Sequence, residues 1–254
     1  MSEEYKNLSI DQLIEALERS GREPPLALIK VCLARRLELR GRLVEAFAEA
    51  IDDDWDDPDD VRWYRAVHYG RLLIAFRERT ALPVFARIYS DTFSYESLIE
   101  WFEEDPAYYG PAAIDTFAGV VRQQDRQIQD EEWDYGRDMS IGVLEQIALQ
   151  YPATRQEILT FLRAMIPDLG ADGSLDWDEE ELGIDEMWSS IVSTLATLRD
   201  ADSVDRALAL FDADLIDETM IARDEFLESF TAKRSLYAVH RFDILRVYGA
   251  SKPR

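Results

Sequence analysis

The chain contains very little cysteine and no long apolar segment. Cys32 is the only cysteine in 254 residues, which excludes an intramolecular disulfide and a zinc cluster built from the cysteines of one chain. No apolar run approaches the roughly 18 residues that a membrane span requires. The N-terminal residues lack the basic start and apolar core of a signal peptide. We therefore expect a cytoplasmic protein that does not associate with membranes.

Motifs that carry catalysis or bind nucleotides are also missing. His68 and His240 are the only histidines, so a zinc-binding helix with histidines four residues apart is excluded. No glycine-rich phosphate loop occurs, and no Gly-x-Ser-x-Gly segment marks a nucleophilic serine. These absences favour a protein that is not an enzyme.

Basic residues are scarce relative to acidic ones. The chain has 28 Lys and Arg against 52 Asp and Glu, which gives a formal net charge of −24, and lysine occurs at only four positions. This composition is typical of halophilic proteins, because the Debye length falls to about 3 Å in molar salt and repulsion between carboxylates is screened. The alternative is an acidic face that fits a basic partner. Under either interpretation, direct binding to nucleic-acid phosphates is disfavoured.

The clearest pattern in the chain is a helical hairpin at residues 68–89, HYGRLLIAFRERTALPVFARIY. Its apolar residues recur at steps of three and four on both sides of a short polar turn, which predicts two amphipathic helices that meet at a corner. A similar pattern returns at residues 193–211, where Leu198-Arg-Asp200 corresponds to Phe76-Arg-Glu78. A repeated hairpin predicts a stacked array of helix pairs.

The remaining sequence extends this helical pattern. Helices are predicted over residues 10–20, 26–39, 43–51, 94–102, 108–123, 138–151, 153–166, 185–198, 203–211 and 225–248, with Ser9, Asp60, Ser94 and Asp185 as N-caps. No alternating strand pattern longer than a few residues occurs. We predict an all-α fold, a HEAT-like α-solenoid of stacked antiparallel helix pairs, with a compact helical bundle as the alternative. It would form one domain, residues 1–254, with acidic loops at 52–60 and 167–183.

Four segments resemble a bacterial family known only as domain of unknown function 1186. They are residues 68–78 with 81–85, Trp188 to Val192 and Ala209 to Asp217, and the resemblance spans roughly residues 10–230. The resemblance implies HEAT-type helix pairs and supplies no catalytic residues. Some relatives carry a cysteine-rich metal-binding tail, which this chain lacks.

Aromatic residues beside acidic segments suggest a place where a partner binds. Trp55 and Trp133 are flanked by acids, and Trp101 lies directly before Phe102 and two glutamates. Most aromatic residues of a helical array pack in its core, but rings beside carboxylates also suit an arginine- or lysine-rich segment. We therefore expect Trp55, Trp101 and Trp133 to contact a protein partner that carries a basic segment.

One acidic loop matches the spacing of a calcium-binding loop. Asp168, Asp172, Asp176 and Glu179 fall at positions one, five, nine and twelve of an EF-hand loop, and Gly173 falls at position six. Gly170 stands at position three, where an oxygen ligand is expected. A Ca²⁺ site and a solvated acidic loop are both compatible with this pattern.

Three functional hypotheses follow from these observations. The leading one is a non-enzymatic helical-repeat scaffold or adaptor that binds another protein and needs no cofactor. The alternatives are an all-α hydrolase whose carboxylates hold a divalent metal ion, and a Ca²⁺-binding module built on residues 168–179.

Overall fold

The structure is a computed structural model that describes residues 3–53, 60–123, 134–172, 174–176, 185–231 and 239–249. These residues are mostly helical, which confirms the prediction of an all-α chain. They belong to two compact units, unit 1 with residues 1–109 and 241–254 and unit 2 with residues 110–240. Unit 1 therefore takes segments from both sides of unit 2 in the sequence. The prediction of one helical-repeat domain stays a prediction.

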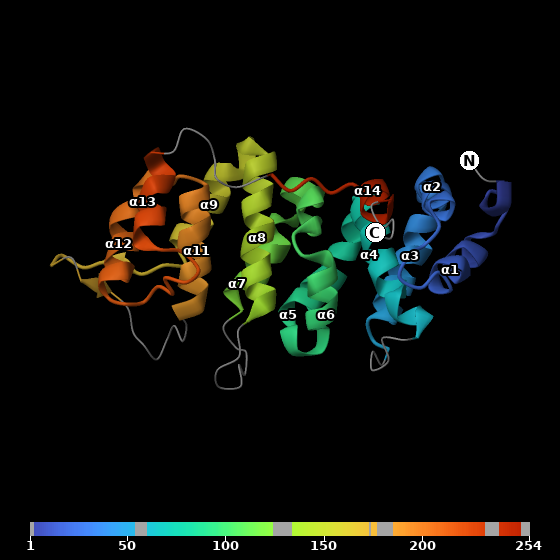
Figure 1. Cartoon of the computed structure of the whole chain (residues 1–254), viewed down its shortest axis with the longest axis horizontal. Coiled ribbons are helices and arrows are strands. Elements are labelled where there is room, and N and C mark those ends of the chain that lie inside the picture. Colours follow the sequence, from blue (N-terminus) through green and yellow to red (C-terminus); the bar gives the residue numbers. More distant parts are fainter. Residues whose placement is uncertain are drawn as a thin grey trace. The chain divides into compact units, whose positions relative to one another are not determined.

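Among the described residues, unit 1 contains mainly α-helices (Figure 1) and three short 3₁₀ (η) turns. The red helix α14 lies beside α2 and α4 of the same unit. The elements are η1 Glu3–Tyr5, α1 Ile10–Glu18, α2 Leu26–Ala34, α3 Arg36–Ala50, η2 Val61–Tyr64, α4 Arg65–Phe76, η3 Arg79–Ala81, α5 Leu82–Ser90, α6 Thr92–Phe102 and α14 Ile244–Gly249.

Three phenylalanines from three helices form the centre of unit 1. Phe47, Phe85 and Phe102 are fully buried, and their ring centroids lie 5.2 to 6.0 Å apart. Gly70 of α4 makes room for this cluster, because a Cβ atom at Gly70 would lie only 2.3 Å from Cζ of Phe102. Helices α4 and α6 can therefore approach closely only at a glycine.

Unit 2 contains a second set of helix pairs and one short hairpin of strands. The η4 segment Asp105–Ala113 joins it to unit 1. Its elements are α7 Ile114–Arg122, α8 Tyr135–Gln150, η5 Pro152–Thr154, α9 Arg155–Arg163, β1 Asp168–Leu169, β2 Leu175–Asp176, α11 Asp185–Thr197, η6 Ala201–Ser203, α12 Val204–Asp212 and α13 Arg223–Thr231. Strands β1 and β2 pair antiparallel, and because each has only two residues, no alternation in the sequence reveals them.

The two hairpins that look alike in sequence turn in the same way. Arg77 ends α4 with φ 53°, and Arg199 follows α11 with φ 50°. In each case the next amide bonds back to a helix carbonyl, over 3.0 Å from Glu78 N to Leu73 O and over 2.9 Å from Asp200 N to Leu195 O. This is the Schellman pattern, and a three-residue 3₁₀ turn follows both times. The predicted helix, turn and helix are confirmed in both places.

Several predicted helix ends are confirmed. Ser9 and Gln12 form a reciprocal capping box at the start of α1, and Asp60 accepts a hydrogen bond from the Arg62 amide at the start of η2. The predicted break at Pro152 separates α8 from α9. The side chain of Asp185 lies outside the described part of the chain, so the cap predicted there stays a prediction.

Some predicted boundaries are wrong. The helix predicted over residues 108–123 begins at Ile114, because the preceding residues form the 3₁₀ segment η4, which is kinked at Gly110. Residues 239–243, inside the predicted range 225–248, are not helical. The helix predicted over residues 26–39 ends at Ala34, because Arg35 leaves helical geometry and its guanidinium donates to the Leu8 carbonyl and to Glu38. The following helix then runs through Gly41, whose missing side chain faces open space. Ser94 is not an N-cap, because Asp91, three residues earlier, accepts from the Ser94 amide over 3.0 Å.

Candidate partner-binding site

Trp101 lies in a cluster of three aromatic rings in unit 1. The ring centroids of Trp63, Tyr64 and Trp101 lie 4.9 to 6.4 Å apart, and the rings meet edge to face. All three side chains are partly exposed. Edge-to-face pairing at these distances adds about 0.5–1.5 kcal/mol per pair to the burial of the rings. The three rings therefore pack against one another and are still partly accessible.

Two arginines lie over the indole ring of Trp101. The guanidinium carbon of Arg22 is 5.3 Å from the ring centroid, and that of Arg71 is 5.2 Å from it. Arg71 also donates to the Trp101 carbonyl over 2.9 Å, and its Nε lies 3.9 Å from a carboxylate oxygen of Asp105. Arg71 and Asp105 are both largely buried, whereas Arg22 is exposed. The two cations thus have different surroundings although they share one ring.

Local structure explains how these side chains come together. The turn η2, capped by Asp60, presents Trp63 and Tyr64, and the last turn of α6 presents Trp101. Arg22 follows Gly21, whose φ of +58° is one that glycine adopts without strain. A Cβ atom at Gly21 would lie 3.7 Å from Val61, so this turn lies against the start of η2. We call Arg22, Val61, Trp63, Tyr64 and Trp101 the Trp101 patch.

A buried histidine connects three parts of unit 1. Nε2 of His68 lies 2.7 Å from the Gly21 carbonyl, and Nδ1 lies 2.7 Å from the Tyr248 hydroxyl. A carbonyl can only accept, so we assign the ring proton to Nε2, and Nδ1 then accepts from Tyr248. Burial lowers the pKa of His68 to about 4, which keeps the ring neutral at pH 7. Arg71 lies over the ring of Tyr248 as well, at 5.6 Å.

The three tryptophans predicted to contact a partner have different outcomes. Trp101 lies in the exposed aromatic cluster just described. Trp55 and Trp133 lie outside the described residues. Arg22 and Arg71 were not predicted as part of this site, because they are far from Trp101 in the sequence and no local spacing connects them to it.

The structure describes only some of the side chains that were predicted to bind a cation. Asp168 pairs with Arg206 of α12, and Asp172 accepts from the amide and the hydroxyl of Ser174, which lowers the pKa of Asp172. The Asp176 side chain and Glu179 lie outside the description. Among the residues that the structure describes, no group of three or more His, Cys, Asp or Glu side chains could hold a metal ion. The calcium site stays a prediction.

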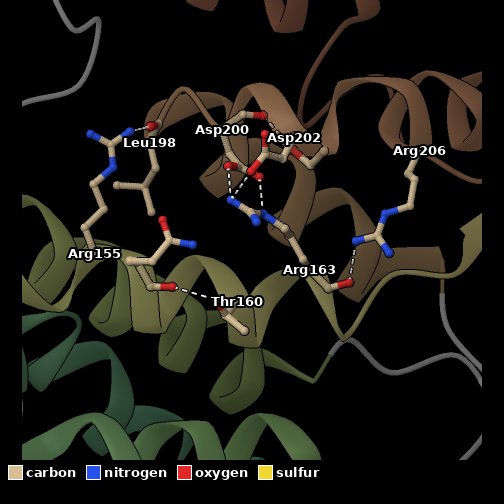
Figure 2. Close-up of polar contacts among 9 residues, drawn as sticks. Arg155, Thr160, Arg163, Leu198, Asp200, Asp202 and Arg206 are labelled. Carbon is tan, nitrogen blue, oxygen red and sulfur yellow. Dashed lines mark hydrogen bonds and ion pairs between the residues drawn. The ribbon is translucent and has the colours of Figure 1, made fainter.

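In unit 2, polar contacts join α9 to the segment that follows α11 (Figure 2). Arg163 makes two parallel hydrogen bonds to the buried carboxylate of Asp200, at 2.6 and 2.7 Å, and a further ion pair of 3.1 Å to Asp202. Arg155 donates to the Leu198 carbonyl, and Arg206 donates to the Arg163 carbonyl over 2.6 Å. Arginine side chains therefore donate hydrogen bonds to carbonyl and carboxylate oxygens where two helix pairs meet.

A second set of buried polar contacts in unit 2 lies between α8 and α11. The Ser190 hydroxyl donates to Asp138, and burial raises the pKa of this carboxyl group. Nearby, Arg137 donates to the Val121 carbonyl over 2.8 and 3.1 Å and lies 2.8 Å from the Met187 sulfur. These contacts hold three helices together and leave Arg137 only 4% exposed, so we assign them a structural role.

Comparisons of the chain with protein-family models, with characterised proteins and with solved structures found no significant match. Across the described residues, no helix is both long enough and apolar enough to cross a membrane.

Proposed function

We propose that this chain is a helical-repeat scaffold that binds another protein. The observation that carries the proposal is the repeated hairpin, in which Arg77 and Arg199 adopt the same left-handed conformation between a helix and a 3₁₀ turn. Helix pairs that recur with one turn geometry bury their apolar faces against their neighbours, and repeat proteins use the continuous surface that results to bind partners.

A second feature recurs at the same place in both hairpins. The acid after the left-handed residue contacts an arginine of a preceding helix, Glu78 with Arg40 at 3.5 Å and Asp200 with Arg163 at 2.6 Å. The first arginine lies on α3, which packs on α4, and the second lies on α9, which contacts α11. A contact that recurs at one position of the repeat supports stacking of HEAT-like pairs, and it agrees with the resemblance to domain of unknown function 1186.

The proposed arrangement can be distinguished from a compact bundle by small-angle X-ray scattering. A compact chain of this length has a radius of gyration of about 18 Å. Stacked helix pairs are longer in one direction, so we expect a value well above this. A value near that of the compact chain would favour the bundle.

Partner binding can be tested by photocrosslinking in cells of the native host, at the salt concentration of that host. A photoreactive amino acid replaces Tyr64 in the Trp101 patch, and in a control chain it replaces Leu37, which is 73% exposed on α3. We expect position 64 to trap one protein that position 37 does not, and the purified partner to bind wild type more tightly than a Trp101→Ala variant. Failure to trap any protein at either position would overturn the proposal.

A further inference from the structure

We propose that the Trp101 patch binds a protein segment in which a carboxylate lies next to an apolar side chain, with Arg22 as the receptor for the carboxylate. This inference rests on the proposed function, because it names the chemistry of the partner that the scaffold binds. The Trp101 patch would therefore prefer an acidic segment, whereas the acidic parts of the surface would prefer a basic one.

Arg22 is prepared to bind an anion. It is exposed, its guanidinium lies over the Trp101 ring at 5.3 Å, and among the described residues it forms neither a hydrogen bond nor an ion pair. Contact with a ring restricts a flexible side chain, and N–H groups of the guanidinium that do not face the ring stay available to an anion. A planar guanidinium held in this way can make two parallel hydrogen bonds to one carboxylate.

The neighbouring arginines of unit 1 differ from Arg22 in this respect. Arg19 pairs with Glu15, Arg62 with Asp60 over 2.6 Å, and Arg71 lies 3.9 Å from Asp105. In a chain with 52 acidic and 28 basic residues, acids are plentiful enough to pair with most arginines. A cation that lies over an aromatic ring and that no described acid neutralises is therefore the feature that points to an external carboxylate.

The rest of the patch supplies an apolar surface beside this cation. Val61 is 53% exposed, and Trp63 and Tyr64 are partly exposed. Tryptophan, tyrosine and arginine are the residue types that contribute most binding energy at protein interfaces. An aliphatic, aromatic or proline side chain next to the carboxylate would bury these surfaces.

Charge at the ring argues against a basic segment at this position. Two guanidiniums already lie within 5.3 Å of the centroid of Trp101, so an arriving lysine or arginine would be placed beside two like charges. The net charge of −24 repels an acidic segment at long range, but in molar salt the Debye length is about 3 Å and only contacts at hydrogen-bond distance remain strong.

The test is a selection of random twelve-residue peptides displayed on phage, against the immobilised full chain in 1 M KCl. Enriched peptides are then labelled with fluorescein, and their affinity is measured by fluorescence anisotropy. Arg22→Gln removes the proposed receptor. Arg36→Gln is the matched control, because Arg36 is also exposed in unit 1 and has no described ion partner but does not lie over an aromatic ring.

We expect the enriched peptides to carry Asp or Glu beside an apolar residue. Arg22→Gln should weaken their binding by about tenfold or more, whereas Arg36→Gln should leave it unchanged, since only Arg22→Gln removes hydrogen bonds to the peptide acid. Replacing the peptide acid by its amide should cost the same factor in wild type and no further loss in Arg22→Gln. Enrichment of basic peptides, equal losses in both variants, or no enrichment would each overturn the inference. If a partner is still trapped from position 64, only this inference fails and the scaffold proposal stands.

Discussion

The Tyr248 hydroxyl lies 2.7 Å from Nδ1 of His68, a residue 180 positions earlier in the chain. His68 is on α4 and Tyr248 is on α14, so one hydrogen bond fixes the returning segment of unit 1 to its centre. Both side chains are buried, and burial raises the pKa of Tyr248 while it lowers that of His68. The pair is therefore neutral over a wide range of pH.

This pair predicts a loss of stability in acid. The pKa of His68 is about 4 in the folded chain and about 6.5 in an exposed histidine, so the unfolded chain takes up the proton first as the pH falls. The stability that neutral His68 contributes is complete above pH 6.5 and is lost as the pH falls toward 4, by about 3 kcal/mol in total. Urea unfolding at several pH values measures it.

A His68→Gln variant separates this effect from the titration of the many carboxylates. Glutamine also carries an acceptor oxygen and a donor NH₂ group, but it does not titrate in this range. We expect wild type to lose more stability than His68→Gln between pH 6.5 and 4. Identical pH dependence in both chains would contradict the assignment of a neutral buried histidine.

Two glycines of unit 1 should respond oppositely to alanine. Gly70→Ala places a Cβ atom 2.3 Å from Phe102, so we expect destabilisation by at least 1–3 kcal/mol, about the cost of overpacking a core. Gly41→Ala meets nothing within 4 Å on the same kind of helix and should stabilise the chain by about 0.5–1 kcal/mol. Thermal unfolding followed by circular dichroism compares the two, and equal shifts would show that Gly70 does not set the distance between α4 and α6.

Two aspartates that contact the same arginine should differ in their contribution to stability. Asp200 is 4% exposed and holds Arg163 through two hydrogen bonds, whereas the Asp202 side chain is 74% exposed. Asp200→Ala leaves a partly buried arginine without its main partner, so we expect a loss of about 2 kcal/mol. Asp202→Ala should change stability by less than about 0.5 kcal/mol. Urea unfolding of both variants tests this order, and a larger effect of Asp202→Ala would contradict it.

Salt should stabilise the whole chain. With a net charge of −24, repulsion between acids opposes the compact state, and added KCl screens it. We expect the midpoint of thermal unfolding to rise steeply between 0.1 M and 2 M KCl. A flat response would indicate that the acids do not destabilise the fold, and the partner interpretation of the acidity would then gain weight.

The helices were predictable because their signals are local. The capping box at Ser9, the break at Pro152 and the matching turns after Phe76 and Leu198 all depend on residues within a few positions of each other. The boundary at Arg35 was not predictable, since its guanidinium contacts the Leu8 carbonyl, 27 residues away. Cap positions also remain ambiguous where several good caps lie close together, as at Asp91 and Ser94.

The site was less predictable than the fold. Trp101 was predicted from its acidic neighbours in sequence, but the charges that lie over its ring in space are the guanidiniums of Arg22 and Arg71. A residue that lies 79 positions away leaves no trace in local spacing. Sequence patterns selected Trp101 as a candidate, and tertiary contacts determined the sign of the charge beside its ring.

The way in which unit 1 is assembled also sets the order of events during translation. Helix α14 follows every residue of unit 2, so His68 meets Tyr248 only after unit 2 has left the ribosome. Unit 2 is continuous in sequence, and all of its residues are synthesised before α14. Until α14 emerges, the nascent chain exposes the surfaces of α2 and α4 that α14 contacts in the finished protein.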